Sequence, residues 1–178
     1  MYRAHNPRWA FAPESGDGAA LTGGRFNSRG TRALYASFRF ETAWLEAQQA
    51  FPFKAQPLTL CAYEVECDDV LDLTDQEILT AHGIAPSDLG CAWKDLETRG
   101  IRPPSWILAE RLMRDGIAGV VVPSYASGAT AADINVVFWN WDSGRPIRFG
   151  LSTKSIGFRK MPVLGDSGTG TLGARSVE

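Results

Sequence analysis

The chain has 178 residues, of which 44% are hydrophobic and 21% charged, and its formal net charge at pH 7 is −2. This length and composition fit one globular domain with a core of its own. No run of about eighteen apolar residues occurs, and the N-terminus is too polar and arginine-rich for a secretory signal. We therefore expect a cytoplasmic protein without a membrane span.

The cysteines and histidines do not show the spacing of a metal site. Cys61, Cys67 and Cys91 are an odd number at no metal-ligand spacing, and neither His5 nor His82 lies near them in the sequence. We expect reduced thiols and no metal ion. A hydrolase with a Ser-His-Asp triad stays open, although neither histidine lies in a recognisable nucleophile motif.

Charge is unevenly distributed along the chain. Residues 1–40 hold six arginines against two acidic residues, residues 41–100 hold three basic against twelve acidic residues, and residues 101–178 hold nine against six. The basic first and last thirds favour a positive face around a small phosphorylated ligand. Binding to nucleic acid would require a basic total or a long basic stripe, and neither is present.

The first half of the chain predicts two strands separated by a long loop, and then a helix. Arg3 lies on the first strand, and residues 7–24, rich in Gly, Pro, Ala and Ser, are expected to form a lid or binding loop. Residues 32–37 are typical of a buried strand. A helix over 38–50 follows, with Ser37 as its cap and a proline just beyond its end.

The second half predicts strands and helices without a regular β-α-β alternation. The expected strands are 58–66 with a short edge continuation at 70–73, then 119–124, a central strand at 134–141, and 146–150. The expected helical segments are 75–82, one or two turns within 86–100, and 106–115 with Ser105 as cap and Gly116 at its end. This order favours an α+β fold with a mixed or antiparallel central sheet and flanking helices. Residues 1–162 are expected to form the single domain, and 163–178 a flexible, glycine-rich tail.

Three residues with reactive side chains lie on three consecutive predicted elements. Arg25 follows two glycines, Tyr35 lies near the end of a strand, and Glu46 lies in the next helix. Trp44 and Leu45 are expected to face the core there, which leaves Glu46 as a half-buried carboxylate. Each residue taken alone is more often structural than functional. Together they suit an anionic ligand with a reactive sugar, such as NAD: the guanidinium binds the diphosphate, the tyrosine ring orients nicotinamide, and the carboxylate stabilises positive charge on the ribose in the transition state.

A second group of polar residues lies at predicted strand ends. Ser124 follows a buried strand, and Asn135 begins the next one. Strand ends expose polar groups to ligands, so Ser124 is a candidate donor to phosphate or ribose. It follows a proline, and a serine in such a turn needs no function. Arg3 is either a second anion contact or a surface residue.

Six short segments occur in one order: YRA at the start, GGRFN with Arg25, LYAS with Tyr35, WLE with Glu46, VPS with Ser124, and NVVFW with Asn135. Over residues 2–150 this set resembles the RES-domain toxins of bacterial toxin–antitoxin pairs. The arginine, glutamate and serine that name the family correspond to Arg3 or Arg25, Glu46 and Ser124. The segments WKDL, PPSWILAERL and NVVFWNW are similar to the ParT-type members. GGRFN departs from many members in having phenylalanine where they have tryptophan.

The resemblance implies a fold similar to the ADP-ribosyltransferases of the diphtheria-toxin and poly-ADP-ribose-polymerase kind, and consumption of NAD as a substrate. It implies cleavage of the nicotinamide–ribose bond and transfer of ADP-ribose to a protein, phosphoribosyl pyrophosphate synthetase in ParT-type members. The alternative acceptor is water or phosphate, which would deplete NAD. An Xre-like antitoxin is expected to cover the active site. The implied catalytic residues are Arg25, Tyr35 and Glu46, and the implied NAD-binding residues are Arg3, Arg25, Tyr35, Ser124 and Asn135.

Two other interpretations stay open. Glu64 and Glu66 form a Glu-x-Glu pair, which carries the catalytic glutamate in other ADP-ribosyltransferases, and on a strand both would point to one face. The tripeptide is common and lies in an acidic stretch, so we favour Glu46. The other interpretation is a module that binds an anionic nucleotide without catalysis, in which case Glu46→Gln would leave the ligand response intact.

Overall fold

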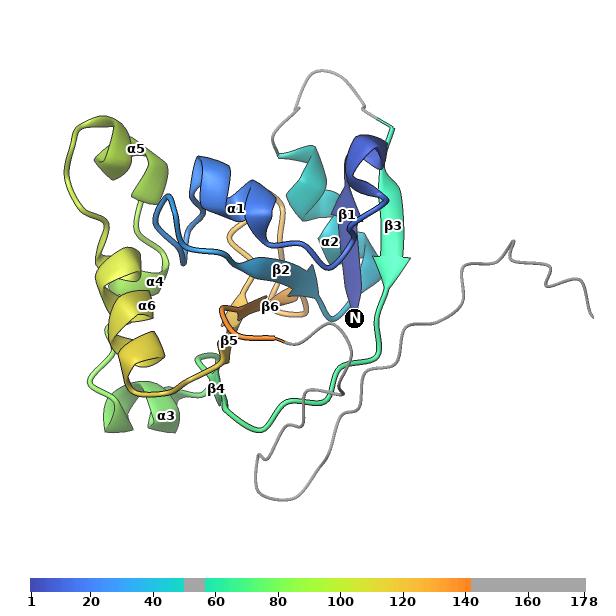
Figure 1. The fold of residues 1–178 in the computed structure, drawn as a ribbon. Helices are drawn as coiled ribbons and strands as arrows, with labels where there is room; N and C mark the ends of the chain where they lie inside the picture. The colour runs from blue at the N-terminus through green and yellow to red at the C-terminus, as the bar shows by residue number, and fades with distance from the viewer. Residues whose placement is uncertain (50–56, 142–178) are drawn as a thin grey trace, which may run out of the picture.

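The computed structural model describes residues 1–49 and 57–141, and this part of the chain is built on one six-stranded sheet (Figure 1). The strands follow the order β3-β1-β2-β6-β5-β4. Neighbouring strands are antiparallel except β4 and β5, which run parallel. The strand bounds are β1 Tyr2–His5, β2 Leu34–Ser37, β3 Thr59–Ala62, β4 Val70–Asp72, β5 Gly119–Pro123 and β6 Ile134–Phe138. A mixed sheet with flanking helices confirms the predicted α+β class. The strand predicted at 146–150 and the tail predicted at 163–178 lie outside the described residues.

The helices gather in two groups along the sheet. In Figure 1, α2 lies against β1 and β2, whereas α3, α4 and α6 lie at the end of the sheet formed by β4 and β5. No helix in the described ranges is long and apolar enough to cross a membrane. The bounds are η1 Pro7–Trp9, α1 Asp17–Thr22, α2 Phe40–Gln48, α3 Gln76–Ala81, α4 Pro86–Leu89, α5 Trp93–Thr98 and α6 Pro104–Arg114.

The apolar runs of β5 and β6 are explained by burial on both faces of the sheet. Along β5, Val120 and Val122 belong to the core cluster that contains α6, whereas Val121 belongs to the cluster on the opposite face. Burying one such side chain contributes about 1.5–3 kcal/mol. On the neighbouring strands, Tyr35 and Val137 pack with the α6 cluster. The prediction of a central strand at β6 is confirmed, and the face that carries Tyr35 is the one that holds the candidate site.

The start of α2 differs from the prediction. The helix begins at Phe40 with Arg39 at its N-cap position, and no side chain caps it. Ser37 remains on β2, where its hydroxyl donates a hydrogen bond of 2.6 Å to Asn135 Oδ1. The prediction of Ser37 as the helix cap was therefore wrong, because its hydroxyl is hydrogen-bonded to Asn135 on the neighbouring strand β6.

The orientation of α2 about its axis also differs. Trp44 was expected in the core, but it is 48% exposed. Thr42 is buried instead, and its hydroxyl donates a 2.6 Å hydrogen bond to Asp133 Oδ1 at the head of β6. A polar anchor thus sets the rotation of the helix, and Glu46, one turn further on, is half-buried as predicted.

Helix α6 begins two residues earlier than predicted. Pro103 takes the N-cap position, and Ser105 is fully buried within the first turn. Its hydroxyl donates to the backbone oxygen of Arg25 at 2.5 Å, so the predicted capping role was wrong. Leu108 and Leu112 are buried as expected, whereas Ile107 is 54% exposed.

Three predicted segments differ from the structure in length, position or type. The strand expected over 58–66 spans only Thr59–Ala62, with Ala62 opposite Tyr2, and just beyond it Tyr63 still exchanges backbone hydrogen bonds with Met1. Residues 70–72 form a strand at the opposite edge of the sheet, parallel to β5, rather than a continuation of β3. The loop expected over 7–24 contains the short helices η1 and α1.

Candidate active site

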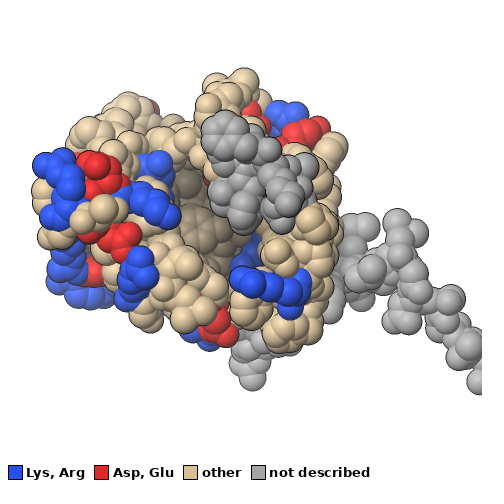
Figure 2. Space-filling model, turned by 90° about the horizontal axis from the view of Figure 1, so that it is seen from above, with Lys and Arg blue, Asp and Glu red and all other residues tan. Residues whose placement is uncertain are grey.

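A cavity of about 620 Å³ opens on the Tyr35 face of the sheet. Ligand pockets in proteins commonly fall between roughly 300 and 1,000 Å³. Its wall combines β1, β2, β5, β6, α2 and the turn that contains Arg25, and α5 adds Trp93 and Lys94. Figure 2 shows the molecule hollowed in its middle, with Lys and Arg side chains around the hollow.

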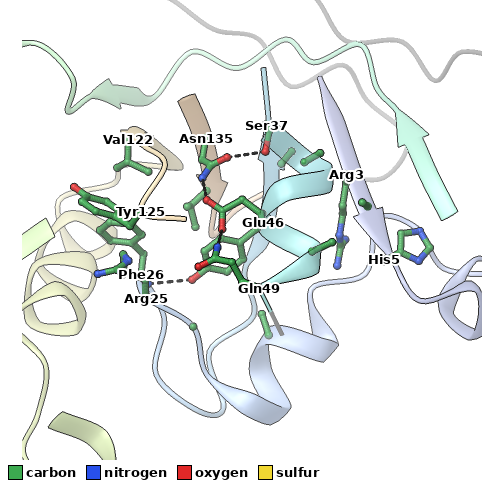
Figure 3. A pocket seen from close by; sticks show the side chains of 18 of the residues that line it. Arg3, His5, Arg25, Phe26, Ser37, Glu46, Gln49, Val122, Tyr125 and Asn135 are labelled. Atoms are coloured by element: carbon green, nitrogen blue, oxygen red, sulfur yellow. Dashed lines mark hydrogen bonds between the residues drawn. The ribbon is translucent and has the colours of Figure 1, made fainter. Parts of the chain in front are cut away.

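Glu46 projects from α2 to the centre of this cavity (Figure 3). Its Oε1 accepts hydrogen bonds from Ser124 Oγ at 2.7 Å and from Asn135 Nδ2 at 2.5 Å. Asn135 is oriented in turn by Ser37, whose hydroxyl donates to Asn135 Oδ1. Hydrogen bonds to a charged acceptor are short and strong, so three side chains from three elements fix one carboxylate conformation.

The second oxygen of Glu46 has a different partner. Gln49 Nε2 donates to Glu46 Oε2 at 2.6 Å, and Gln49 lines the cavity. The sequence analysis missed Gln49, although residues three apart on a helix are neighbours and the spacing would have indicated it. Gln49 is exposed, so a ligand can displace its amide from Oε2 while Oε1 stays held.

Arg25 follows a turn in which two successive positions, Gly23 and Gly24, require glycine. Gly23 has a positive φ of 70°. A Cβ on Gly24 would lie 2.5 Å from the Tyr35 hydroxyl oxygen. Arg25 Nη1 donates to the carbonyl oxygens of Leu89 at 3.2 Å and Cys91 at 2.6 Å, which ties the turn to the last residue of α4 and to the segment that follows it.

The guanidinium of Arg25 also lies over an aromatic ring. Its Cζ is 4.4 Å from the ring centroid of Tyr125, a residue that lines the cavity and that the sequence analysis missed. Tyr125 follows Ser124 directly, so one turn after β5 contacts both Arg25 and Glu46. Stacking and the two carbonyl contacts leave the guanidinium little freedom to move.

Tyr35 lines the cavity with its ring and supports the turn with its hydroxyl. The hydroxyl donates to Asn27 Oδ1 at 2.7 Å and accepts from the backbone N–H of Phe26 at 3.0 Å. Burial raises the pKa of the hydroxyl well above its usual range. Tyr35 is therefore a neutral phenol that holds the Arg25 turn, and its buried partner Asn27 was not foreseen.

Arg3 lines the cavity on the side away from Arg25. Its Nη1 donates to the carbonyl oxygens of Pro13 and Ser15, each at 2.9 Å. Burial lowers its pKa, and a guanidinium remains charged despite such a shift. Arg3 thus holds the segment before α1 while presenting positive charge to the cavity, so it is not the free surface residue that was the other option.

Of the predicted site residues, Arg3, Arg25, Tyr35, Glu46 and Asn135 all line this one cavity. Ser124 does not line it but lies behind Glu46 and holds its Oε1. The Glu-x-Glu pair at 64 and 66 lies outside both the cavity and any strand. The expectation that this pair would share a strand face was therefore wrong.

The fold and the cavity together define an α+β protein in which the carboxylate of Glu46 lies between Arg25 on one side and Arg3 on the other (Figure 3). Positive guanidinium groups around a cavity are suited to an anionic ligand, and a fixed carboxylate is suited to positive charge that develops beside it. Residues 1–150 match the family model of the RES domain, and the chain belongs to this family.

The fold is similar to a solved structure. It matches a chain of the crystal structure of the M. tuberculosis MbcT–MbcA toxin–antitoxin complex with a TM-score of 0.56 and 22% sequence identity. The match covers 77% of this chain and 71% of that chain. No curated protein matches this sequence significantly.

Proposed function

We propose that the protein is the toxin of a toxin–antitoxin pair and that it cleaves the bond between nicotinamide and ribose in NAD. Three observations support the proposal: membership of the RES family, the likeness in fold to a chain of a toxin–antitoxin complex, and the site itself. The observation that carries the chemistry is the position of Glu46 in the cavity wall, with Oε1 held by Ser124 and Asn135 and Oε2 bonded to the exposed amide of Gln49.

In the proposed reaction, Arg25 and Arg3 attract the diphosphate of NAD, and the carboxylate of Glu46 lies beside the nicotinamide ribose. The glycosidic C–N bond breaks, its electron pair leaves with neutral nicotinamide, and the ribose becomes positively charged at C1′. Glu46 stabilises this charge, which exists only near the transition state, so it accelerates the reaction more than it strengthens substrate binding. An acceptor then attacks C1′ and loses a proton.

The acceptor is proposed to be a protein, with phosphoribosyl pyrophosphate synthetase as the candidate implied by the ParT-type resemblance. The second option is water or phosphate, with growth arrest through loss of NAD. Incubating the purified protein with labelled NAD and cell extract separates them, because only the first option gives a labelled protein band. The labelled target must then disappear with the Glu46→Gln variant.

We also propose that the partner is an Xre-like antitoxin that covers the cavity. A carboxylate or the C-terminus of a partner would suit the guanidinium of Arg25. Arg25→Ala should weaken the neutralisation complex, as measured by calorimetry with purified antitoxin. Unchanged affinity would exclude Arg25 from the interface.

The decisive experiment compares Glu46→Gln with Glu64→Gln. Glu46→Gln should lower nicotinamide release by about 100- to 1,000-fold while NAD affinity changes little, because a charge acting on the transition state is lost. Glu64 is exposed and outside the cavity, so Glu64→Gln should behave as wild type. Nicotinamide release that survives Glu46→Gln would overturn the catalytic role, and no release from wild type would favour the non-catalytic binding module.

A further inference from the structure

Cys61 and His5 form a thiol–imidazole pair that the proposed reaction does not use. Cys61 Sγ lies 3.4 Å from His5 Nε2, and His5 Nδ1 lies 3.0 Å from the carbonyl oxygen of Asn6. A carbonyl only accepts hydrogen bonds, so Nδ1 carries the ring proton and Nε2 offers its lone pair to the thiol. A nucleophile, a base and a group that orients the base are the three parts of an activated nucleophile.

The other two cysteines lack such a base. Cys67 is 1% exposed, and burial raises the pKa of its thiol to about 11. Cys91 Sγ lies 3.3 Å from the hydroxyl of Ser105, which is a far weaker base than imidazole. Cys61 is half-buried on the edge strand β3, within reach of small molecules from solution. The structure therefore singles out one of three thiols.

The pair adjoins the cavity on the Arg3 side. Cys61 lies directly opposite Arg3 in the antiparallel register of β1 and β3, and residues opposite each other point to the same face. His5 lines the cavity, and Figure 3 shows it beside Arg3. A group attached to Cys61 would thus lie next to the Arg3 guanidinium.

We propose that Cys61 is a site of reversible mixed-disulfide formation with small disulfides, and that the attached group obstructs the Arg3 end of the cavity. His5 takes the thiol proton, and the Cys61 sulfur attacks one sulfur of the disulfide. A new S–S bond forms as the old one breaks, and the leaving thiolate takes the proton back from the imidazolium. The obstruction of NAD turnover rests on the proposed function, whereas the modification itself does not.

Oxidised glutathione tests the modification. Wild type, His5→Gln, Cys61→Ser and Cys91→Ser are incubated with it at pH 7, and the adduct is followed by intact-protein and peptide mass spectrometry. We expect one glutathionyl group, on Cys61, that dithiothreitol removes. Because His5 is the base that takes the thiol proton, His5→Gln should slow formation of the adduct by about tenfold.

The proposal that Cys61 is the activated thiol would be overturned if Cys91 or Cys67 reacted as fast as Cys61, or if His5→Gln left the rate of adduct formation unchanged. Cys91→Ser serves as the matched control, since it should keep the wild-type rate at Cys61. Should His5→Gln fail to fold, His5→Phe removes the base while filling the same space.

The obstruction is tested on the modified protein. Fully glutathionylated wild type should lose most of its nicotinamide release, and Cys61→Ser after the same treatment should keep its own untreated rate. If every Cys61 carried a glutathionyl group and nicotinamide release were unchanged, the proposal that the attached group obstructs the cavity would be overturned. If the untreated protein released no nicotinamide, the proposed function would fail while the mass-spectrometric result stood, and calorimetry with ADP-ribose would then report whether the adduct blocks the cavity.

Discussion

The hydroxyl of Ser124 donates a hydrogen bond of 2.7 Å to Glu46 Oε1, which joins the turn after β5 to helix α2. The backbone N–H of Ala126 donates to the same hydroxyl oxygen at 3.2 Å, so the serine proton is directed at the carboxylate. Ser124 does not line the cavity, so its hydroxyl orients Glu46 rather than contacting a ligand there.

Removing that hydroxyl should impair turnover more than binding. A hydrogen bond to a charged group is worth about 1.5–3 kcal/mol, so Ser124→Ala should lower nicotinamide release by roughly 10- to 100-fold with NAD affinity little changed. Steady-state kinetics measures both quantities. The exposed Ser87 on α4 provides the control, since Ser87→Ala should have no effect. A rise in KM alone would instead indicate direct contact between Ser124 and NAD.

Tyr125 should act on NAD binding through Arg25. The ring lies under the guanidinium at 4.4 Å, and such a contact contributes about 0.5–2 kcal/mol. Tyr125→Ala should therefore raise the dissociation constant of NAD by roughly 2- to 30-fold, measured by calorimetry with the inactive Glu46→Gln protein. Tyr125→Phe keeps the ring and should bind as the parent does. Equal losses in both variants would show that the hydroxyl, not the ring, matters.

Tyr35→Phe distinguishes a ring that orients nicotinamide from a hydroxyl that supports the Arg25 turn. The change leaves Asn27 Oδ1 and the Phe26 N–H without their partner. Unpaired buried polar groups cost about 1–3 kcal/mol, so the free energy of unfolding should fall by that amount in urea denaturation. If stability stayed at the wild-type value, the hydroxyl would have no structural role.

Acid should weaken the anchor between α2 and the head of β6. Hydrogen bonds from Thr42 and Thr130 lower the pKa of Asp133 from an ordinary 3.8 to about 2. A lowered folded-state pKa means that the charged form stabilises the fold above pH 4, and that this contribution is lost as pH falls from about 4 to 2. The gap in Tm between wild type and Asp133→Asn should be constant above pH 5 and shrink towards pH 2. A gap independent of pH across this range would contradict the assignment.

The existence and type of most elements could be predicted from the sequence. Periodicity and end signals placed α3, α6 and the two central strands, because apolar spacing reflects which faces are buried. Caps were predicted less well: Ser37 and Ser105 have the right residue type in the right place, yet their hydroxyls bond to Asn135 and to the Arg25 backbone. A cap competes with partners from distant elements, and local sequence does not show those partners.

The sequence by itself determined the α+β class and five of the residues that line the cavity, Arg3, Arg25, Tyr35, Glu46 and Asn135, because motif order and burial patterns are local properties. Only the tertiary structure decided how they are used. Ser124 is 78 residues from Glu46 in the chain and Asn135 is 89 away, and their hydrogen bonds require β5 and β6 to bring both to one end of the sheet. Gln49, Tyr125 and the pairing of His5 with Cys61 likewise depend on strand order and helix rotation, which long-range packing sets.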